Sequence, residues 1–189
     1  MVSQAKGDRR AKVLEDALTY RLVETSAASA EVVYDLLADI ATHLEWGGAM
    51  QPKRTFKLLS IDAPTAPASV GTEFRSVGAD AMGRFDDSSV VTEAIRPSVF
   101  EFVTESRLST KKGKLGRWTN VHRYEVTQRA SGCEIAYTWR AADVRAFPGA
   151  MAMFKVPGLR ALGLKVSASN SRRGIRNLAR LAEERASAH

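Results

Sequence analysis

The sequence predicts a single α+β domain in which a curved antiparallel sheet of about seven strands wraps around a long C-terminal helix. One strand pattern and two short helical patterns come first, six strand patterns follow, and one long amphipathic pattern ends the chain. Short turns join the strand patterns and favour antiparallel neighbours, because parallel neighbours need long crossovers. The length of 189 residues suits one domain, which we place at 18–189 after an N-terminal arm at 1–17.

The composition is that of an ordinary soluble globular protein, with 44% hydrophobic and 26% charged residues. Cys133 is the only cysteine, which excludes a disulfide within the chain and argues against a cysteine-based metal site. No apolar run approaches the roughly 20 residues that span a bilayer, and the N-terminus lacks the apolar core of a signal peptide. We therefore expect a cytoplasmic protein.

The net charge of +7 is concentrated near the C-terminus. Eight basic and two acidic residues lie between Lys155 and Arg185, so the rest of the chain is nearly neutral. This distribution argues against a general nucleic-acid-binding surface, and we expect no nucleic-acid partner. A single basic helix remains as a contact site for an acidic partner.

The first part of the domain predicts a strand followed by two short helices. The alternating pattern LTYRLVETS indicates a strand at 18–26. Ser29 is a candidate N-cap for a helix over 29–39, in which apolar residues repeat at helical spacing. A second helix is expected at 42–46, with Trp46 closing it before a glycine pair breaks the pattern.

Six further strands are expected in the middle of the chain, each bounded by turn residues. The expected strands are 54–61, 72–78, 85–95, 99–107, 117–128 and 133–143. The turns between them fall at 64–71, 82–83, 96–98, 111–116 and 131–132.

The last segment predicts a long amphipathic helix that begins, or kinks, at Pro157–Gly158. At 100° per residue it has an apolar stripe and an adjacent basic face. The stripe contains Leu164, Ala168, Ser171, Ile175, Leu178, Ala179 and Ala182, and the basic face contains Lys165, Arg172, Arg173, Arg176 and Arg180. The stripe is rich in small side chains, so either the helix packs closely on the sheet, which the sequence slightly favours, or space for a ligand remains beneath it.

Strand alternation indicates which side chains face inward. The inward faces are aromatic with a few polar interruptions, as ligand pockets tend to be, and we expect them to line an internal cavity. The expected ligand-binding residues on these faces are Phe74, Phe100, Phe102, Trp118, Asn120, His122, Tyr124, Tyr137 and Trp139. For the tryptophans and tyrosines, plain core packing is an equally good explanation.

Four stretches carry a family resemblance: VETSAASAEVVYDLLADIATHLEW, VGTEFRSV, SSVVTEAIRPSVFEFVTES and SNSRRGIRNLARLAEE. Across roughly residues 18 to 186, their order resembles the START-related SRPBCC superfamily, and within it the polyketide cyclase/dehydrase and lipid-transport group. The resemblance implies a helix-grip fold with a deep cavity. It places Trp46 near the cavity mouth, which makes Trp46 the tenth expected ligand-binding residue. It implies little about a reaction, because the superfamily includes carriers, cyclases and hydrolases.

Asn120 and His122 are the sharpest candidates for chemistry. A buried histidine can hydrogen-bond a ligand carbonyl or act as a general base, because its reference pKa is about 6.5. The alternative, which the sequence favours, is a core histidine satisfied by a neighbouring hydroxyl or carbonyl. Whether the protein is an enzyme stays open; if it is one, His122 is the candidate acid/base and Tyr124 the candidate proton donor.

The sequence predicts no metal site and no cofactor. Asp86–Asp87 is expected to begin a strand in solvent, and His43 has no partner histidine at i+4. The chain has no nucleophile elbow, Walker A loop or dinucleotide-binding glycine fingerprint. Cys133 follows a turn glycine without a base nearby in sequence, so we expect a structural role for it.

The leading hypothesis is a soluble carrier or sensor that binds a lipid-like, polyketide-like or aromatic molecule. The first alternative is a cyclase or dehydratase acting on a polyketide-like substrate. The second is an interaction module that docks its basic helix on an acidic partner or, peripherally and without stable insertion, on an anionic membrane. A basic loop formed by Lys111, Lys112, Lys114 and Arg117 is either a solvated hairpin or a lid that contacts an anionic head group.

Overall fold

The computed structural model describes residues 18–52, 55–146 and 148–188 and confirms the α+β prediction. The predicted arm at 1–17 lies outside the described residues. One seven-stranded antiparallel sheet has the order β1-β7-β6-β5-β4-β3-β2, so β2 to β7 form a meander and β1 pairs with β7. The strands are β1 (Thr19–Ser26), β2 (Lys57–Asp62), β3 (Glu73–Ala79), β4 (Gly83–Ile95), β5 (Val99–Thr110), β6 (Leu115–Gln128) and β7 (Cys133–Ala146).

The helical segments of the described residues lie before and after the meander. They are α2 (Ala30–Ala38), η1 (Ile40–Thr42), η2 (Glu45–Ala49), η3 (Gly149–Lys155) and α3 (Pro157–Ser187). Ser29 is the N-cap of α2 as predicted, because its side chain accepts a hydrogen bond from Val32 N at 3.4 Å. Pro157 marks the beginning of α3 and not a kink, since η3 is a separate 3₁₀ helix. No helix in the described part of the chain is long and apolar enough to cross a membrane.

The predicted end of the second short helix is wrong. Trp46 does not close it, because the π-helical segment η2 continues through Gly47 and Gly48 to Ala49. A side chain at Gly48 would place its Cβ 2.7 Å from the backbone oxygen of Leu58 in β2. The glycine pair therefore allows η2 to lie against the edge of the sheet instead of breaking the helix.

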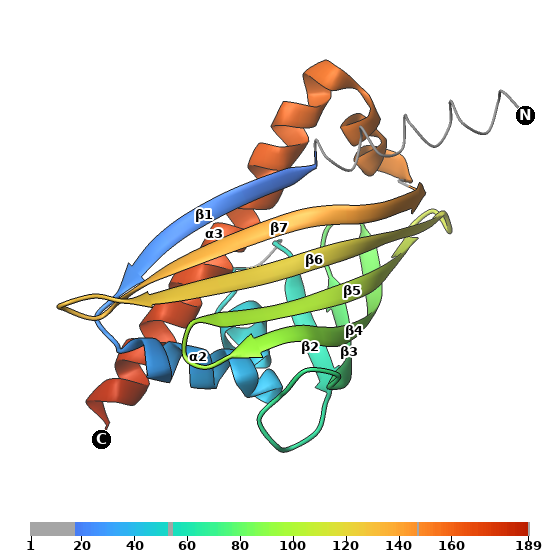
Figure 1. Ribbon diagram of the computed structural model, residues 1–189. Helices are drawn as coiled ribbons and strands as arrows, with labels where there is room; N and C mark the ends of the chain where they lie inside the picture. Colours follow the sequence, from blue (N-terminus) through green and yellow to red (C-terminus); the bar gives the residue numbers. More distant parts are fainter. Residues whose placement is uncertain (1–17, 53–54, 147, 189) are drawn as a thin grey trace, which may run out of the picture.

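The sheet is strongly curved around α3, as Figure 1 shows. Interruptions of the strand register accompany this curvature, and they lie in β2, in β4 between Val91 and Glu93, and at two places in β7, opposite 117–118 and 119–120 of β6. Such bulges bend a strand and increase its local twist. Strands β5 and β6 also run further than predicted, so the loop expected at 111–116 shortens to a turn at 111–114.

The two alternatives for the apolar stripe of α3 both hold, each for one half of the helix. In the C-terminal half, Ile175, Leu178 and Ala182 are buried in the main hydrophobic core. In the N-terminal half, Ser167 and Ser171 border an open cavity, and their hydroxyl groups contact the Tyr20 hydroxyl of β1. Close packing and space for a ligand therefore coexist along one 31-residue helix.

Polar contacts fix the C-terminal half of α3 to β1. The Ser26 hydroxyl donates a hydrogen bond to the backbone carbonyl of Ala179 at 3.1 Å, and Arg176 Nε lies 2.6 Å from Glu24 Oε2. Exposed ion pairs of this kind contribute less than about 1 kcal/mol, so the buried side chains supply most of the stabilisation. Figure 1 shows this half of α3 next to α2, away from the beginning of β1.

Candidate functional site

A cavity of about 550 Å³ lies between the inner face of the sheet and the N-terminal half of α3. This volume is within the range of pockets that hold small organic molecules. Segments η2 and η3 and the β3–β4 turn also contribute lining residues. Its large aromatic side chains include Phe74, Phe85, Phe102, Trp118, Tyr137, Trp139 and Phe154.

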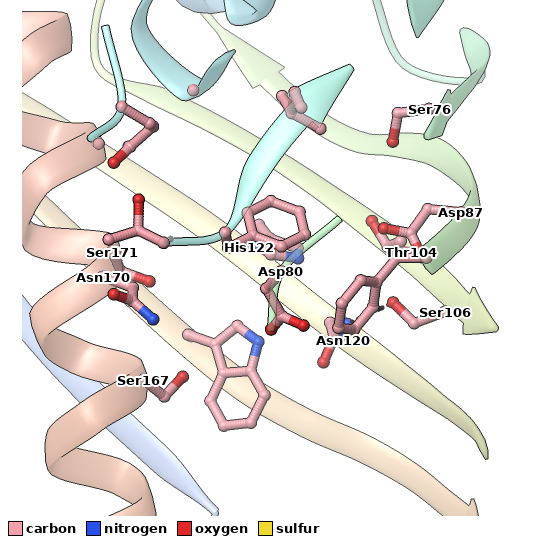
Figure 2. Close-up of a pocket in the computed structure, with 18 of the residues that line it drawn as sticks. Ser76, Asp80, Asp87, Thr104, Ser106, Asn120, His122, Ser167, Asn170 and Ser171 are labelled. Carbon is pink, nitrogen blue, oxygen red and sulfur yellow. Dashed lines mark hydrogen bonds between the residues drawn. The ribbon is translucent and has the colours of Figure 1, made fainter. Parts of the chain in front are cut away.

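A polar band crosses the sheet between two groups of apolar side chains. One row of this band consists of Ser76, Asp87 and Ser106, which lie opposite one another on β3, β4 and β5. The next row consists of Ser89, Thr104 and Asn120 on β4, β5 and β6. Phe102 belongs to the hydrophobic cluster on one side of the band and Phe85 to the cluster on the other. Figure 2 shows the labelled residues of the band facing Ser167, Asn170 and Ser171 of α3 across the cavity.

Asp87 faces the cavity, so the prediction that Asp86–Asp87 lies in solvent is wrong for the second residue. Neighbouring residues of a strand point to opposite faces, and therefore only Asp86 is exposed, 3.4 Å from Arg84 Nε. Burial raises the pKa of Asp87 to about 6, although a hydrogen bond with the Ser106 hydroxyl lowers it in part. The band thus contains a carboxyl group whose pKa lies well above that of an exposed aspartate.

Asn120 extends this network toward α3. Its Nδ2 donates a hydrogen bond to Ser106 Oγ at 2.9 Å. Asn120 Oδ1 and Asp87 Oδ1 are buried, as is Trp46 Nε1, and none of these atoms has a hydrogen-bond partner among the described residues. Buried polar atoms without partners are uncommon in folded proteins, and here they belong to residues that line a cavity.

A second polar group lies beneath α3. His122 Nδ1 and the Tyr137 hydroxyl are 2.8 Å apart, and the Tyr20 hydroxyl lies 2.8 Å from Ser171 Oγ. His122 therefore has the hydroxyl partner predicted for a core histidine, and it also lines the cavity. Its pKa falls to about 3, first because the ring is buried and second because His43 is close.

His43 lines the cavity although the sequence did not single it out as a site residue. Its Nε2 lies 2.9 Å from the Leu37 carbonyl, and its ring packs on Trp46 with centroids 4.6 Å apart. Burial lowers its pKa to about 4. In the part of the chain that the structure describes, no three histidine, cysteine, aspartate or glutamate side chains are grouped so that they could hold a metal ion.

We expect acidification to lower the free energy of unfolding. Between about pH 6.5 and 4 the unfolded chain binds a proton at His43 that the folded protein does not bind, so stability falls as the pH falls. His122 acts in the same direction. Asp87 acts in the opposite direction between about pH 6 and 3.8, because its folded carboxyl group is protonated first. Two histidines outweigh one carboxyl group, and the net loss from about pH 7.5 to about pH 5 is on the order of 2–3 kcal/mol.

Urea unfolding followed by circular dichroism at the two pH values measures this loss. His43→Phe should reduce the pH dependence, whereas Asp87→Asn should increase it, since the opposing group is then absent. Equal stability of the wild-type protein at both values would contradict the prediction.

Nine of the ten predicted ligand-binding residues line the cavity. These are Trp46, Phe74, Phe102, Trp118, Asn120, His122, Tyr124, Tyr137 and Trp139. Phe100 does not line the cavity, so its prediction as a ligand-binding residue is wrong. Its side chain has no exposed surface and packs edge-on against Tyr34 of α2. Alternation gave its face correctly, but α2 covers that end of the sheet and separates it from the cavity.

Sequence reasoning missed several residues that border the cavity. They include Tyr20, His43, Asp80, Asp87, Ser89, Ser106, Met151, Phe154, Ser167 and Asn170. Asp87, Ser89 and Ser106 share the alternation that identified Asn120, so the same signal could have found them. Met151, Phe154 and Ser167 border the cavity because η3 and α3 cross the inner face of the sheet. No local sequence pattern indicates where these helices cross it.

The predicted basic surfaces are exposed. Lys111, Lys112, Lys114 and Arg117 all lie in solvent, as do the five residues of the predicted basic face of α3. Arg176 pairs with Glu24, and Arg180 Nε lies 3.7 Å from Glu184 Oε1, so acidic neighbours partly offset this charge. Docking of the basic helix on an acidic partner stays a prediction.

The chain resembles solved structures in fold. A protein of unknown function from Staphylococcus aureus superposes with a TM-score of 0.60 at 12% identity, covering 90% of this chain and 96% of that one. An uncharacterized protein from Rhizobium leguminosarum has a TM-score of 0.61 at 13% identity, covering 88% and 94%. A protein from Chromobacterium violaceum has a TM-score of 0.58 at 14% identity, covering 87% and 96%. No protein-family model and no curated protein matches the chain. At these identities the likeness concerns the helix-grip-like fold.

Proposed function

We propose that this protein binds a small hydrophobic molecule as a carrier or sensor, and that it belongs to the polyketide cyclase/dehydrase and lipid-transport group of the START-related SRPBCC superfamily. The observation that carries the proposal is the cavity of about 550 Å³ beneath α3, with its largely aromatic lining. Lipid-like, polyketide-like and aromatic molecules are the ligand classes that fit it. Each Å² of apolar surface that such a ligand buries contributes about 25 cal/mol.

The proposed ligand would be held by aromatic faces and oriented by polar side chains. All three tryptophans of the chain, Trp46, Trp118 and Trp139, line the cavity, so their fluorescence should report its occupancy. Asn120 and His122 offer hydrogen-bonding groups at two places along it. The four stretches that resemble the superfamily and the fold likeness to solved structures support the family assignment.

Native mass spectrometry of the freshly purified protein tests the proposal. We expect a population heavier than the apo chain, whose additional mass is released on denaturation and identified in the extract. The neutral dye N-phenyl-1-naphthylamine provides a second test, because its fluorescence rises when it enters an apolar cavity. An apo mass together with no binding of the dye would overturn the proposal.

A cyclase or dehydratase is the second candidate, and the hydrogen bond between His122 and Tyr137 is the observation in its favour. Two further observations favour binding over catalysis. The lowered pKa of His122 makes it a weak base, because its protonated form is disfavoured near neutral pH. Burial also raises the pKa of Tyr124, which makes this hydroxyl a poor proton donor.

His122→Phe separates the two candidates. The phenyl ring keeps the stacking on Phe102, where the ring centroids are 4.7 Å apart, and loses only the hydrogen bond to Tyr137. A binding protein should therefore retain its affinity for N-phenyl-1-naphthylamine within about fivefold, or about 1 kcal/mol. Titration of the dye into both proteins measures this. Loss of turnover of a polyketide-like substrate with unchanged binding would support the enzyme instead.

A further inference from the structure

The cavity lining is acidic, although the chain carries a net charge of +7. Asp80 and Asp87 both line it, whereas no lysine or arginine is among the described residues that do so. The two lining histidines, His43 and His122, have lowered pKa values and are neutral near pH 7. A ligand carboxylate or phosphate would therefore meet two carboxyl groups and no described cation in a desolvated space.

The network around Ser106 determines which atoms remain for a ligand. Its oxygen accepts the hydrogen bond from Asn120 Nδ2 at 2.9 Å, and Asp87 lies opposite it on β4. This assigns the amide orientation and leaves Asn120 Oδ1 as an acceptor. Asp87 Oδ1 is a second acceptor without a partner among the described residues. Both acceptors belong to neighbours of Ser106, since Asn120 is hydrogen-bonded to it and Asp87 is its partner in the register of β4 and β5.

Asp80 differs from Asp87 in this respect. Its Oδ1 already accepts hydrogen bonds from the backbone N–H groups of Met82 and Gly83, at 2.7 and 3.2 Å. Asp80 therefore adds negative charge to the cavity and stabilises its own turn. Asp87 is the lining carboxyl group with a buried, unpartnered oxygen.

We propose that the ligand of this cavity is an apolar molecule with a protonated amine, which lies between Asp87 and Asn120. This inference rests on the proposed function. A primary ammonium group has three donors and a positive charge, so it satisfies both open acceptors and offsets the Asp87 carboxylate. A hydroxyl group has one donor and no charge, and it leaves one acceptor unpaired.

The surroundings of Asp87 support a cation. Trp118 lies opposite Ser106 on β6, and Phe74 and Phe102 meet edge-to-face with centroids 5.4 Å apart beside the polar band. Aromatic faces attract organic cations, by about 0.5–2 kcal/mol when the cation is desolvated. The other ionisable groups of the described lining are Asp80, the neutral His122 and His43, and the hydroxyl groups of Tyr20, Tyr124 and Tyr137. Asp86 and Arg107 lie on the outer face of the sheet.

A matched series of naphthalenes tests the proposal by displacement of N-phenyl-1-naphthylamine. The series keeps the ring and changes the substituent: 2-naphthylmethylamine, 2-naphthylmethanol, 2-methylnaphthalene and 2-naphthoate. At about pH 7.5 we expect the amine to bind at least about tenfold more tightly than the naphthoate and the methylnaphthalene. The inference would be overturned if 2-naphthoate or 2-naphthylmethanol bound as tightly as the amine.

Asp87→Asn assigns the preference to one residue. Asparagine has the same shape without the charge, so the affinity advantage of the amine should fall by about tenfold. The affinity for 2-naphthylmethanol should stay within about threefold of the wild-type value. Asp86→Asn is the matched control on the outer face of the sheet, and it should leave both affinities unchanged. An amine preference that survives Asp87→Asn would overturn the inference. If the dye and all four naphthalenes fail to bind, the proposed function itself fails.

Discussion

Replacing Leu178 by alanine is expected to lower the free energy of unfolding by about 3 kcal/mol, within the range of about 2–5 kcal/mol for buried leucines. Leu178 has no exposed surface and lies in the main hydrophobic core with Ile175 and Ala182. The substitution removes three carbon atoms, Cγ and the two Cδ methyl groups, from the hydrophobic core to which α3 contributes. Neighbouring side chains close such a space only partly, so the contacts are lost.

Leu162→Ala is the control for this prediction, because Leu162 belongs to the same helix and is 54% exposed. Its effect should stay within about 0.5 kcal/mol. Urea unfolding followed by circular dichroism measures both variants and the wild-type protein. Equal losses for the two leucines would mean that the C-terminal half of α3 does not pack on the sheet.

Replacing Ser167 by tryptophan is expected to weaken ligand binding nearly 100-fold. Ser167 projects from the N-terminal half of α3 into the cavity (Figure 2). An indole there would displace about 100 Å² of apolar ligand contact, which corresponds to about 2.5 kcal/mol at 25 cal/mol per Å². The hydrogen bond of 3.2 Å between Ser167 and Tyr20 is lost, but Tyr20 keeps its partner Ser171 at 2.8 Å. The fold should therefore tolerate the change.

Ser169→Trp provides the matched control, since Ser169 is exposed on the same turn of α3 and does not line the cavity. Titration with N-phenyl-1-naphthylamine compares the two variants, and thermal unfolding verifies that both are folded. Wild-type affinity in a folded Ser167→Trp variant would place the binding site outside the cavity beneath α3.

Local patterns predicted most of the fold. Period-two alternation identified the strands, and the helical repeat after Ser29 identified α2 with its N-cap. These features depend on neighbours in the sequence, so they can be recognised without tertiary contacts. The exception is the glycine pair after Trp46, which permits a close approach of η2 to Leu58 instead of ending a helix. Only the packing of η2 on β2 distinguishes the two roles of glycine.

The candidate site was predicted in part, because alternation indicates the face of a residue and not its position along the sheet. It placed Phe100 and His122 on the inner face, and both are there. The position of α2 then buries Phe100, while the cavity remains open at His122. Asp87 was misjudged because a pair of adjacent aspartates was treated as a unit, although strand geometry sends its members to opposite faces.

The sequence by itself determined the order of the elements, the inward faces of the strands and the apolar stripe of α3. Each of these follows from the periodicity of one segment. Only the tertiary structure decided that α3 is packed in the core at Leu178 and borders a cavity at Ser167. It also brought Asp87, Ser106 and Asn120 together, since they are far apart along the chain and meet only through the register of β4, β5 and β6. A cavity and its chemistry depend on such long-range placement, which local periodicity does not contain.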